Sequence, residues 1–347
     1  MRSTLYSIEK FADFSRRWDT LNQQTQNQAI LDADFVSCLI AHFFKGSEQL
    51  VVVEQADEPV FIGFFERCGF GCWQTVMPSQ APLGLWLAAQ HQITESLLQQ
   101  IARALPGLVL QVDLLQADSR QLQVDVNIYQ QFYIETGNRA VPIHYDDFTK
   151  SIGKNLRQNC NKAYNRAERD NERLESALII NVDDIADGVL CYAKIESQSW
   201  KAKEGTALSP NNAQSRFYQE MMTTLARRNA ACIWYFMVSG KVAAVDLCVI
   251  KDKSLIILKT TFDEQYSRYS PALLLKLDML KHYAAHPELG VNNIEFYGKA
   301  MDWHKRLNSD LRSIVHLSWQ STRLLKWMVR KLKQRKQSKI PTQPQAE

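Results

Sequence analysis

The chain has 347 residues, of which 46% are hydrophobic and 22% are charged. This composition is typical of a soluble globular protein, and the length suits two domains. No apolar run approaches the ~18 residues that a membrane-spanning helix needs, and no apolar signal-peptide segment stands near residue 1. The seven cysteines are odd in number and scattered, which favours a reducing compartment over a disulfide framework. We therefore expect a cytoplasmic protein.

The net charge of +4 is unevenly distributed along the chain. Residues 321–347 contain eight Lys or Arg and one Glu, whereas the remainder is slightly acidic and does not favour nucleic acid as a partner. Within this tail, apolar residues recur on one face of a predicted helix and basic residues lie mostly elsewhere. Such a helix can pack against the body, or it can lie on an anionic membrane surface. The second alternative predicts peripheral contact with the inner face of the membrane through residues 323–339.

The first half of the chain alternates helix-like and strand-like segments. Apolar residues at helical spacing predict helices within residues 5–48 and at about 88–104. Runs of β-branched and aromatic residues predict strands at 50–55, 59–69, 108–116 and 123–136. We predict a mixed α/β domain over residues 1–145, in which we find no chemical motif.

A polar helix is predicted at residues 151–173. It contains Lys or Arg at positions 154, 157, 162, 166, 169 and 173. A solvated helix that joins two domains explains this pattern. A basic ridge for an anionic partner such as phosphate or RNA is the alternative, which the interleaved Asn and acidic residues weaken.

The second half has a clearer order of elements. Helices are predicted at 185–200, 209–229 and 271–286, and strands at 232–238, 241–250, 253–262, 292–298 and 313–320. Antiparallel strands followed by a crossover helix predict an α+β layer fold over residues 146–320. Asp246 falls inside an apolar strand, and either a cleft-lining face or an exposed face would explain it.

Residues 260–284 join a buried strand to a helix through a short polar turn. Because a residue before proline is pushed toward extended backbone angles, we expect Ser270 to be extended and to act as an N-cap. Pro271 then suits the first helical position, where its missing N–H costs nothing. The segment either binds a ligand or only turns a corner.

The start of this helix has the layout of an anion site. The free N–H groups of Ala272, Leu273 and Leu274 would point at a ligand, and the helix dipole would favour negative charge. Arg268, just before the cap, would add a charge-assisted hydrogen bond. Farther along the helix, we expect Lys276 to face outward from the apolar stripe.

Three stretches of the second half carry a resemblance to a known family. These are ESQSWKAKEGTAL (196–208), LKTTFDEQYSRYSPALLL (258–275) and IEFYGKAMDWHKRLNSD (294–310). They resemble, in turn, the Glu–Trp–Lys segment, the strand and Ser-Pro helix start, and the Trp-Lys end piece of GNAT acyltransferases, in the branch of CelD-like and FemAB-like proteins. The resemblance covers about residues 145–320, and residues 1–145 are similar only in layout. It implies tandem GNAT-like α+β domains, each with a mixed, mainly antiparallel sheet flanked by helices.

The resemblance also implies an activity. The donor would be an acyl-CoA, acetyl-CoA in the first place, without a metal, and the acceptor an amine or hydroxyl of a sugar or other cell-envelope or polysaccharide precursor. The residues expected at the pyrophosphate of CoA are Arg268, Tyr269, Ser270, Ala272 and Leu273. Ala272 stands where the family usually has Gly, which makes close approach to a phosphate harder. Two alternatives stay open: FemAB-like transfer from aminoacyl-tRNA, and a non-catalytic GNAT-shaped partner at the membrane.

Direct acyl transfer needs a base for the acceptor and a donor for the developing charge. Asp263 and Glu264 lie just after the end of a strand, and Glu196 is carried over from the resemblance. Asp263 can equally open the turn, and Glu196 can equally be a charge on a helix surface. Tyr266 can protonate a thiolate, with aromatic packing in the loop as its alternative.

Five residues are candidates for the acceptor site, namely Trp200, Lys201, Lys259, Trp303 and Lys305. The first two would line the acceptor pocket, and Lys259 would meet an anionic group. Trp303 and Lys305 would clamp a charged group. Core packing is the alternative for Trp200, an outward-facing strand position for Lys259, and a solvated basic turn for the last pair.

Overall fold

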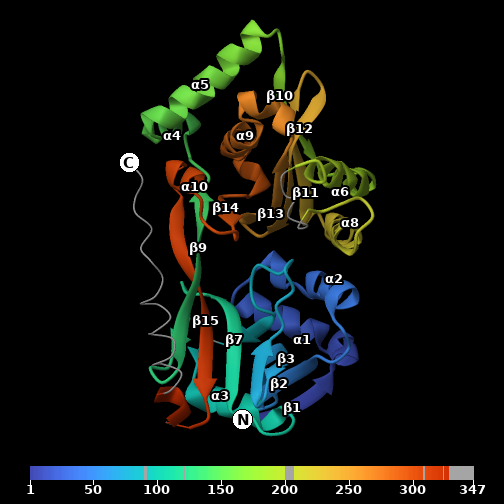
Figure 1. Cartoon of the computed structure of the whole chain (residues 1–347), viewed down its shortest axis with the longest axis vertical. Coiled ribbons are helices and arrows are strands. Elements are labelled where there is room, and N and C mark those ends of the chain that lie inside the picture. Colours follow the sequence, from blue (N-terminus) through green and yellow to red (C-terminus); the bar gives the residue numbers. More distant parts are fainter. Residues whose placement is uncertain (90–91, 121, 200–206, 308, 323, 328–347) are drawn as a thin grey trace. The chain divides into compact units, whose positions relative to one another are not determined.

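The computed structural model describes residues 1–89, 92–120, 122–199, 207–307, 309–322 and 324–327. This part of the chain divides into two compact units, each made of discontinuous segments (Figure 1). Unit 1 contains residues 1–26 and 44–133 together with the described residues from 313 onward, and unit 2 contains residues 27–43 and 134–312.

Unit 1 is built on a sheet with the strand order β1-β2-β3-β4-β7-β15. Neighbouring strands are antiparallel, except that β4 and β7 are parallel. The strands are β1 (Arg2–Ser7), β2 (Gln49–Gln55), β3 (Glu58–Gly69), β4 (Cys72–Thr75), β7 (Gln111–Asp118) and β15 (Asp310–Gln320), with β5 (Trp86–Ala88) beside β3 and a separate pair of β6 (Gln92–Ile93) and β8 (Gln123–Val124). The helices are η1 (Ile8–Lys10), α1 (Phe11–Gln24) and α3 (Glu95–Ala104).

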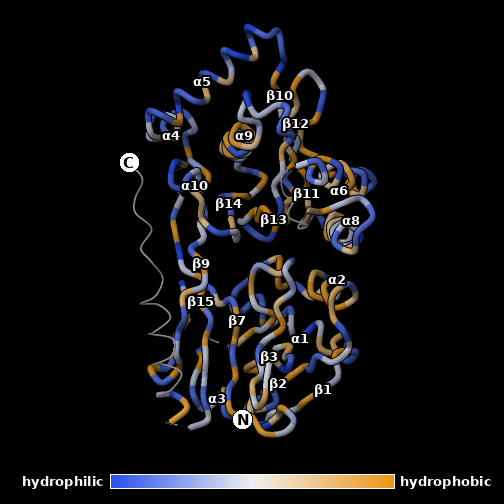
Figure 2. Tube along the Cα trace, viewed as in Figure 1, coloured by the Kyte–Doolittle hydropathy of each residue, from blue (hydrophilic) through white to orange (hydrophobic). Residues whose placement is uncertain are grey.

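The core of unit 1 is formed by strands that are buried at consecutive residues, such as β2 and β3, and by the apolar stripes of the helices. Phe11, Phe14 and Trp18 lie on one face of α1 and are buried, as their helical spacing predicts. Helix α3 begins at Thr94, whose side chain accepts a hydrogen bond from the N–H of Leu97 at 3.2 Å. Figure 2 shows the apolar strands of the sheet.

Unit 2 is built on a sheet with the strand order β9-β14-β13-β12-β11-β10. Neighbours are antiparallel, except that β13 and β14 are parallel. The strands are β9 (Tyr129–Ala140), β10 (Leu174–Ile179), β11 (Ala231–Val238), β12 (Lys241–Lys251), β13 (Ser254–Phe262) and β14 (Asn293–Phe296). The helices are η2 (Ala29–Leu31), α2 (Ala33–Phe43), α4 (Tyr145–Ser151), α5 (Lys154–Arg169), α6 (Val182–Glu196), α8 (Ala213–Ala226), η4 (Glu264–Tyr269), α9 (Pro271–Ala285), η5 (Pro287–Leu289) and α10 (Asp302–Arg306).

Helices cover both faces of the unit 2 sheet. Helices α6 and α8 lie on one face and α9 lies on the other (Figure 1). Helix α6 packs close to β11 at Gly188, where an added Cβ would lie 2.4 Å from the Cδ1 atom of Ile233. Helix α5 is apolar on one side only, and Figure 2 shows it as a mostly hydrophilic segment.

The two sheets share one plan. Each has four successive antiparallel strands, then a parallel neighbour, and then an antiparallel strand at the end of the order. The last strand comes from the other half of the sequence, because β15 pairs with β7 and β9 pairs with β14. This repetition of one plan confirms the predicted fold class of tandem domains with mixed, mainly antiparallel sheets.

The compact units differ from the continuous segments 1–145 and 146–320 that we predicted. Helix α2 belongs to unit 2, because Phe35 packs edge-on against Phe217 of α8, with ring centroids 5.9 Å apart. Most of β15 belongs to unit 1 through its pairing with β7. Such long-range pairings leave no signal in the local pattern of residues.

Local predictions were wrong at three places. Residues 2–7 form an edge strand, β1, ahead of the expected helices. Residues 174–179 form β10, which we did not predict. The expected helix 151–173 is shorter, because α5 spans 154–169 and a separate helix, α4, ends at Ser151 before an extended Ile152.

Candidate active site

The parallel strands β13 and β14 of unit 2 separate before β13 ends. Their pairing runs from Ser254 with Asn293 to Ile257 with Phe296. Residues 258–262 of β13 continue beyond it and pair with β12 on their other side. An open strand edge therefore lies next to the N-terminal end of α9.

A cavity of about 440 Å³, here called the β13 cavity, lies at this open edge. Its walls come from α5, the end of β13, the start of α9 and the segment around α10. The lining residues are Leu156, Asn159, Ser199, Thr260, Thr261, Phe262, Glu264, Ala272, Leu273, Lys276, Met301, Trp303 and Arg306. The volume falls within the range of about 300–1,000 Å³ for small-molecule sites.

One member of a buried ion pair, Lys276, lines this cavity. The Nζ atom of Lys276 contacts the Oδ2 atom of Asp246 and donates a hydrogen bond to the Oγ1 atom of Thr260 at 3.2 Å. Lys276 is 4% exposed and Asp246 is fully buried. The Oδ1 atom of Asp246 has no hydrogen-bond partner among the described residues.

Two of our expectations fail at this pair. We expected Lys276 to face outward, yet it points from α9 toward the sheet. The exposed alternative for Asp246 is wrong, because the residue is fully buried. Asp246 does not itself line the cavity but pairs with Lys276, which does. Asp246 lies opposite Thr260 in the register of β12 and β13, so both reach the same face as Lys276. Two sequence signals, an acid in an apolar strand and a lysine in an apolar helical run, could together have predicted this buried ion pair.

His304 is buried beside this wall. Its ring stacks on Trp303, with centroids 3.6 Å apart, and its Nδ1 atom accepts a hydrogen bond from the N–H of Met301 at 2.8 Å. Burial lowers the pKa of His304 to about 4, and the positive charge of Lys276 acts in the same direction. We did not predict a role for this residue.

The turn before α9 differs from our expectation at Ser270. Its backbone is left-handed, with φ 52° and ψ 48°, and its side chain does not cap the helix. The six-residue 3₁₀ helix η4 ends at Tyr269, and the left-handed residue redirects the chain into α9. Ala272 and Leu273 line the β13 cavity. The N–H groups of Leu273 and Leu274 are not free as we expected, because each donates to the carbonyl oxygen of Ser270 at 3.1 Å. The described residues offer no acceptor for the N–H of Ala272.

Arg268 and Tyr269 are engaged away from the β13 cavity. The guanidinium of Arg268 pairs with Asp170 at 2.6 Å, and the hydroxyl of Tyr269 donates to the same carboxylate at 2.8 Å. This hydrogen bond from Tyr269, together with Arg268, lowers the pKa of Asp170. In addition, Arg166 donates to the carbonyl oxygen of Arg268 at 2.8 Å. These contacts tie η4 to the C-terminal end of α5.

The acidic candidates after β13 have different positions. The carboxylate of Asp263 accepts the N–H of Gln265 at 2.9 Å and caps η4, which is the turn-forming alternative. Glu264 lines the β13 cavity. Tyr266 is partly buried and packs against the core of unit 2 without lining the cavity.

Glu196 is neither a surface charge nor a cavity residue. It is fully buried, and its carboxylate accepts the hydroxyl of Tyr192 at 2.6 Å and the N–H of Leu208 at 2.7 Å. Burial and the Glu196 charge together hold the pKa of Tyr192 far above its ordinary value. Glu196 therefore anchors the segment that follows α6.

The acceptor-site candidates do not all come together. Trp303 lines the β13 cavity, whereas Lys305 is exposed and does not. Lys259 lies with its Nζ atom 5.8 Å from the ring centroid of Tyr218 on α8. Trp200 and Lys201 lie outside the described residues.

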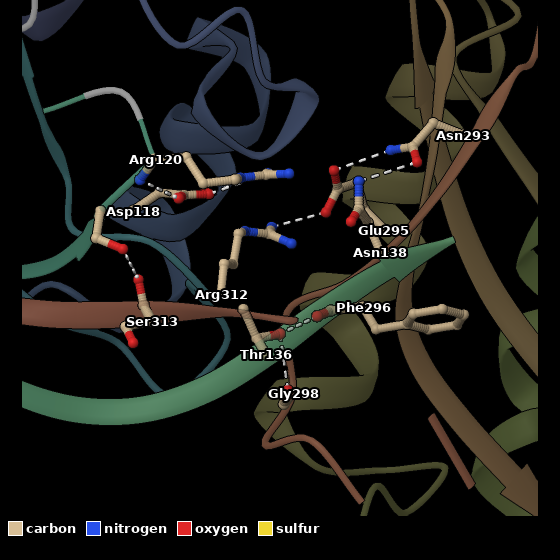
Figure 3. Close-up of polar contacts among 11 residues, drawn as sticks. Asp118, Arg120, Thr136, Asn138, Asn293, Glu295, Phe296, Gly298, Arg312 and Ser313 are labelled. Carbon is tan, nitrogen blue, oxygen red and sulfur yellow. Dashed lines mark hydrogen bonds and ion pairs between the residues drawn. The ribbon is translucent and has the colours of Figure 1, made fainter. Parts of the chain in front are cut away.

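A second buried ion pair lies in unit 2, away from the β13 cavity. Arg312 contacts Glu295 at 2.7 Å, and both side chains are at most 5% exposed. Figure 3 shows Asn293 beside them, which donates to the Oε1 atom of Glu295 at 2.9 Å. The guanidinium also lies 4.9 Å from the ring centroid of Tyr297. Neither Arg312 nor Glu295 lines the cavity.

The predicted membrane-contact segment lies mostly outside the described residues. In its described part, residues 324–327, Lys326 pairs with Glu95 of α3 at 2.5 Å, while Leu324 and Trp327 are exposed. No helix in the described ranges is both long and apolar enough to cross a bilayer. The same residues contain no group of three His, Cys, Asp or Glu side chains placed to hold a metal ion.

One family model matches part of unit 2. Residues 154–305 match the family model described as acetyltransferase (GNAT) domain. No curated protein matches the chain by sequence.

Several solved structures share the fold. A crystal structure of FemX has a TM-score of 0.56 and 9% identity, over 95% of this chain and 100% of that one. A conserved protein of unknown function from Bacteroides thetaiotaomicron has a TM-score of 0.54 and 11% identity, over 88% and 97%. The C-terminal domain of a protein assigned as a lysylphosphatidylglycerol synthetase from Agrobacterium fabrum has a TM-score of 0.50 and 12% identity, over 93% and 96%.

At such low identity these similarities show the fold and not the substrates. The predicted GNAT-like fold is confirmed, whereas the CelD-like branch stays a prediction. Residues 154–305, which include every residue that lines the β13 cavity except Arg306, match the GNAT acetyltransferase domain, and this match supports acyl transfer as the class of reaction.

Proposed function

We propose that the protein transfers an acyl group from acyl-CoA, acetyl-CoA in the first place, to an amine or hydroxyl of a sugar or other cell-envelope precursor. The β13 cavity is the proposed place of transfer. One observation carries this proposal: a largely apolar cavity at an open strand edge contains a buried ammonium, that of Lys276, in its wall. Apolar walls suit the acyl and pantetheine chain, and a single fixed cation suits the charge that forms during transfer.

Lys276 is the proposed electrostatic catalyst. When the acceptor attacks the thioester carbonyl, the carbonyl oxygen becomes an oxyanion, and it returns to a carbonyl as the C–S bond breaks. An ammonium that is already oriented by Asp246 and Thr260 can stabilise this negative charge without reorganisation. The thiolate of CoA then leaves as the acyl product forms.

Glu264 is the proposed general base. It is the one carboxylate among the described residues that line the cavity. A base must lie within hydrogen-bond reach of the proton that it removes from the acceptor. The carboxylate of Glu196, at the end of α6, is buried and accepts the N–H of Leu208, and that of Asp263 caps η4. Glu264 therefore replaces both as our candidate for this step.

The N–H of Ala272 at the start of α9 is the proposed contact for the donor pyrophosphate. It belongs to a helix of 15 residues, whose N-terminal end favours negative charge. The Ala272 side chain narrows the approach in comparison with glycine. We expect Ala272→Gly to strengthen CoA binding a few-fold, measured by calorimetric titration.

Ligand binding and turnover test the proposal. CoA and acetyl-CoA should raise the melting temperature, and the CoA thiol should be released in the presence of amine or hydroxyl acceptors. Lys276→Met and Glu264→Gln should each lower turnover at least about a hundredfold. Lys281→Met, which removes an exposed lysine from the same helix, is the matched control and should keep turnover.

Two results would count against this function. If CoA compounds do not change the melting temperature, acyl-CoA is not the donor. A change with aminoacyl-tRNA would favour the FemAB-like alternative. Full activity of Lys276→Met would show that the buried ammonium takes no part in the reaction, and the proposal would lose its main support.

The contribution of Asp263 can be separated from catalysis by a pair of substitutions. Asp263→Ser keeps a side chain that can cap η4, whereas Asp263→Ala does not. If Asp263 acts through the turn, the serine variant keeps most of the turnover and the alanine variant loses more. Equal and complete loss in both variants would instead support direct participation.

A further inference from the structure

A second hollow of unit 2, here called the basic groove, lies beside the β13 cavity. It has a volume of about 590 Å³ and is lined by Gly153, Lys154, Asn155, Leu156, Gln158, Asn159, Lys162 and Arg306. These residues include three cations and three amide side chains but no carboxylate. The groove and the cavity share Leu156, Asn159 and Arg306, so they adjoin each other.

The helical spacing explains why these groups face one hollow. Lys154, Gln158 and Lys162 follow one another every four residues of α5, which places them on one face. Leu156 and Cys160 are buried in the core of unit 2, and of these two only Leu156 also borders the groove. The basic groove therefore collects the cations of one exposed helix face.

The cations of α5 fall into two groups. Arg157 and Arg166 donate to backbone carbonyls, and Arg169 lies 3.6 Å from Asp170. In contrast, the side chains of Lys154 and Lys162 form no ion pair or hydrogen bond among the described residues. The same holds for the side chain of Arg306 of α10. Three like charges around one hollow without a counter-charge create a positive potential that attracts an anion.

We propose that the basic groove binds a phosphate or diphosphate group of the acyl acceptor. This inference rests on the proposed function, because it takes the β13 cavity as the place of transfer. The groove shares residues with that cavity but contains none from α9, where we place the donor pyrophosphate. The acceptor is thus a phosphorylated compound whose amine or hydroxyl reaches into the cavity from the side of α5.

Inorganic pyrophosphate is the probe for the test, titrated into the full-length protein by calorimetry after saturation with CoA. CoA occupies the donor site, so the remaining binding reports the basic groove. Lys154→Ala/Lys162→Ala should weaken this binding about tenfold, because two charge-assisted contacts are lost. Raising the salt from low to high concentration should weaken it in the wild type and much less in the variant.

Lys150→Ala is the matched control. Lys150 is an exposed lysine at the end of α4, close in sequence to the groove, and it does not line it. Its removal should change pyrophosphate binding less than twofold. Because all three lysines are exposed, circular dichroism should show the same fold in each variant.

Each outcome decides a different statement. Equal pyrophosphate binding by the wild type and Lys154→Ala/Lys162→Ala would overturn the site. Loss of pyrophosphate binding upon CoA saturation of the wild type would assign the anion to the donor and overturn the acceptor assignment. If CoA itself does not bind, the proposed function fails, and the same titration of the CoA-free variants still decides whether the groove binds an anion.

Discussion

The two buried ion pairs of unit 2 have the same kind of chemistry and different surroundings. Lys276 lines the β13 cavity, and its partner Asp246 is fully buried and does not line it. Arg312 and Glu295 lie away from the cavity, and Asn293 and the ring of Tyr297 complete their surroundings. Burying two charges is costly, so neither pair is a simple source of stability. Lys276 of the first pair is placed to meet a ligand in the cavity, whereas neither member of the second pair lines it.

The largest expected effect separates activity from stability at the cavity pair. Lys276→Met should raise the activation barrier by about 3 kcal/mol, which lowers turnover at least about a hundredfold. It should also destabilise the fold by about 3–5 kcal/mol. Lys276→Met/Asp246→Leu should recover most of the stability, because no charge is left buried, but not the turnover. Urea denaturation and thiol release measure the two quantities. Recovered turnover in the double variant would show that the pair is structural.

The enclosed pair should respond in the opposite way. Arg312→Met should destabilise the fold by about 3–5 kcal/mol, because it leaves Glu295 buried without its cation. Turnover per folded molecule should stay within about threefold of the wild type, since neither residue lines the cavity. Arg312→Met/Glu295→Leu is the control for the buried charge and should regain stability. A hundredfold loss of turnover in a folded Arg312→Met protein would erase the distinction between the two pairs.

His304 reports the charge of Lys276 through its titration. Its pKa of about 4 lies below the ordinary value of 6.5, so the unfolded chain binds the proton first. Stability from this group is therefore present above pH 6.5, is lost as the pH falls toward 4, and amounts to about 3 kcal/mol at most. Denaturation at pH 7 and pH 5 should show the loss, and His304→Asn should remove most of it. In Lys276→Met the pKa of His304, followed by NMR, should rise; an unchanged value would mean that burial alone sets it.

The exposed pair of Arg268 and Asp170 completes the comparison with the smallest effect. Arg268 is half-exposed, so water and salt screen its interaction with Asp170. If the pair acts by holding η4 against α5, Arg268→Ala and Asp170→Ala should weaken CoA binding equally, and by no more than about threefold. Calorimetric titration with CoA measures this. Weaker binding in Arg268→Ala alone would support direct contact between Arg268 and the donor phosphates.

The accuracy of the sequence predictions followed the range of the interactions. The strands of unit 2 from 231 to 262 and the helix at 271–285 were predicted well, because apolar runs and a Ser-Pro start are local signals. Ala272, Leu273 and Trp303 do line the β13 cavity, although their roles stay predictions. The extended backbone predicted for Ser270 was wrong, because the turn after η4 overrides the preference of a residue before proline.

The missed parts of the site depend on pairing across long distances in the sequence. Asp246 and Lys276 are 30 residues apart, and only the register of β12 and β13 under α9 brings them together. Arg268 had the right charge for a phosphate, but the C-terminal end of α5 places Asp170 beside it. The basic groove likewise needs α10 to bring Arg306 next to α5.

By itself, the sequence determined the class of elements, the apolar strands, the resemblance to GNAT acyltransferases and the position of the strand–turn–helix segment. These features depend on residue periodicity and on short motifs, which act within a few residues of each other. The tertiary structure decided that β9 pairs with β14 and β15 with β7, and that β14 stops pairing with β13 before β13 ends. It also decided which charged side chains are buried. Those outcomes depend on which segments pair and pack, and so the identity of Lys276 as a cavity residue emerged only once α9 lay on the sheet.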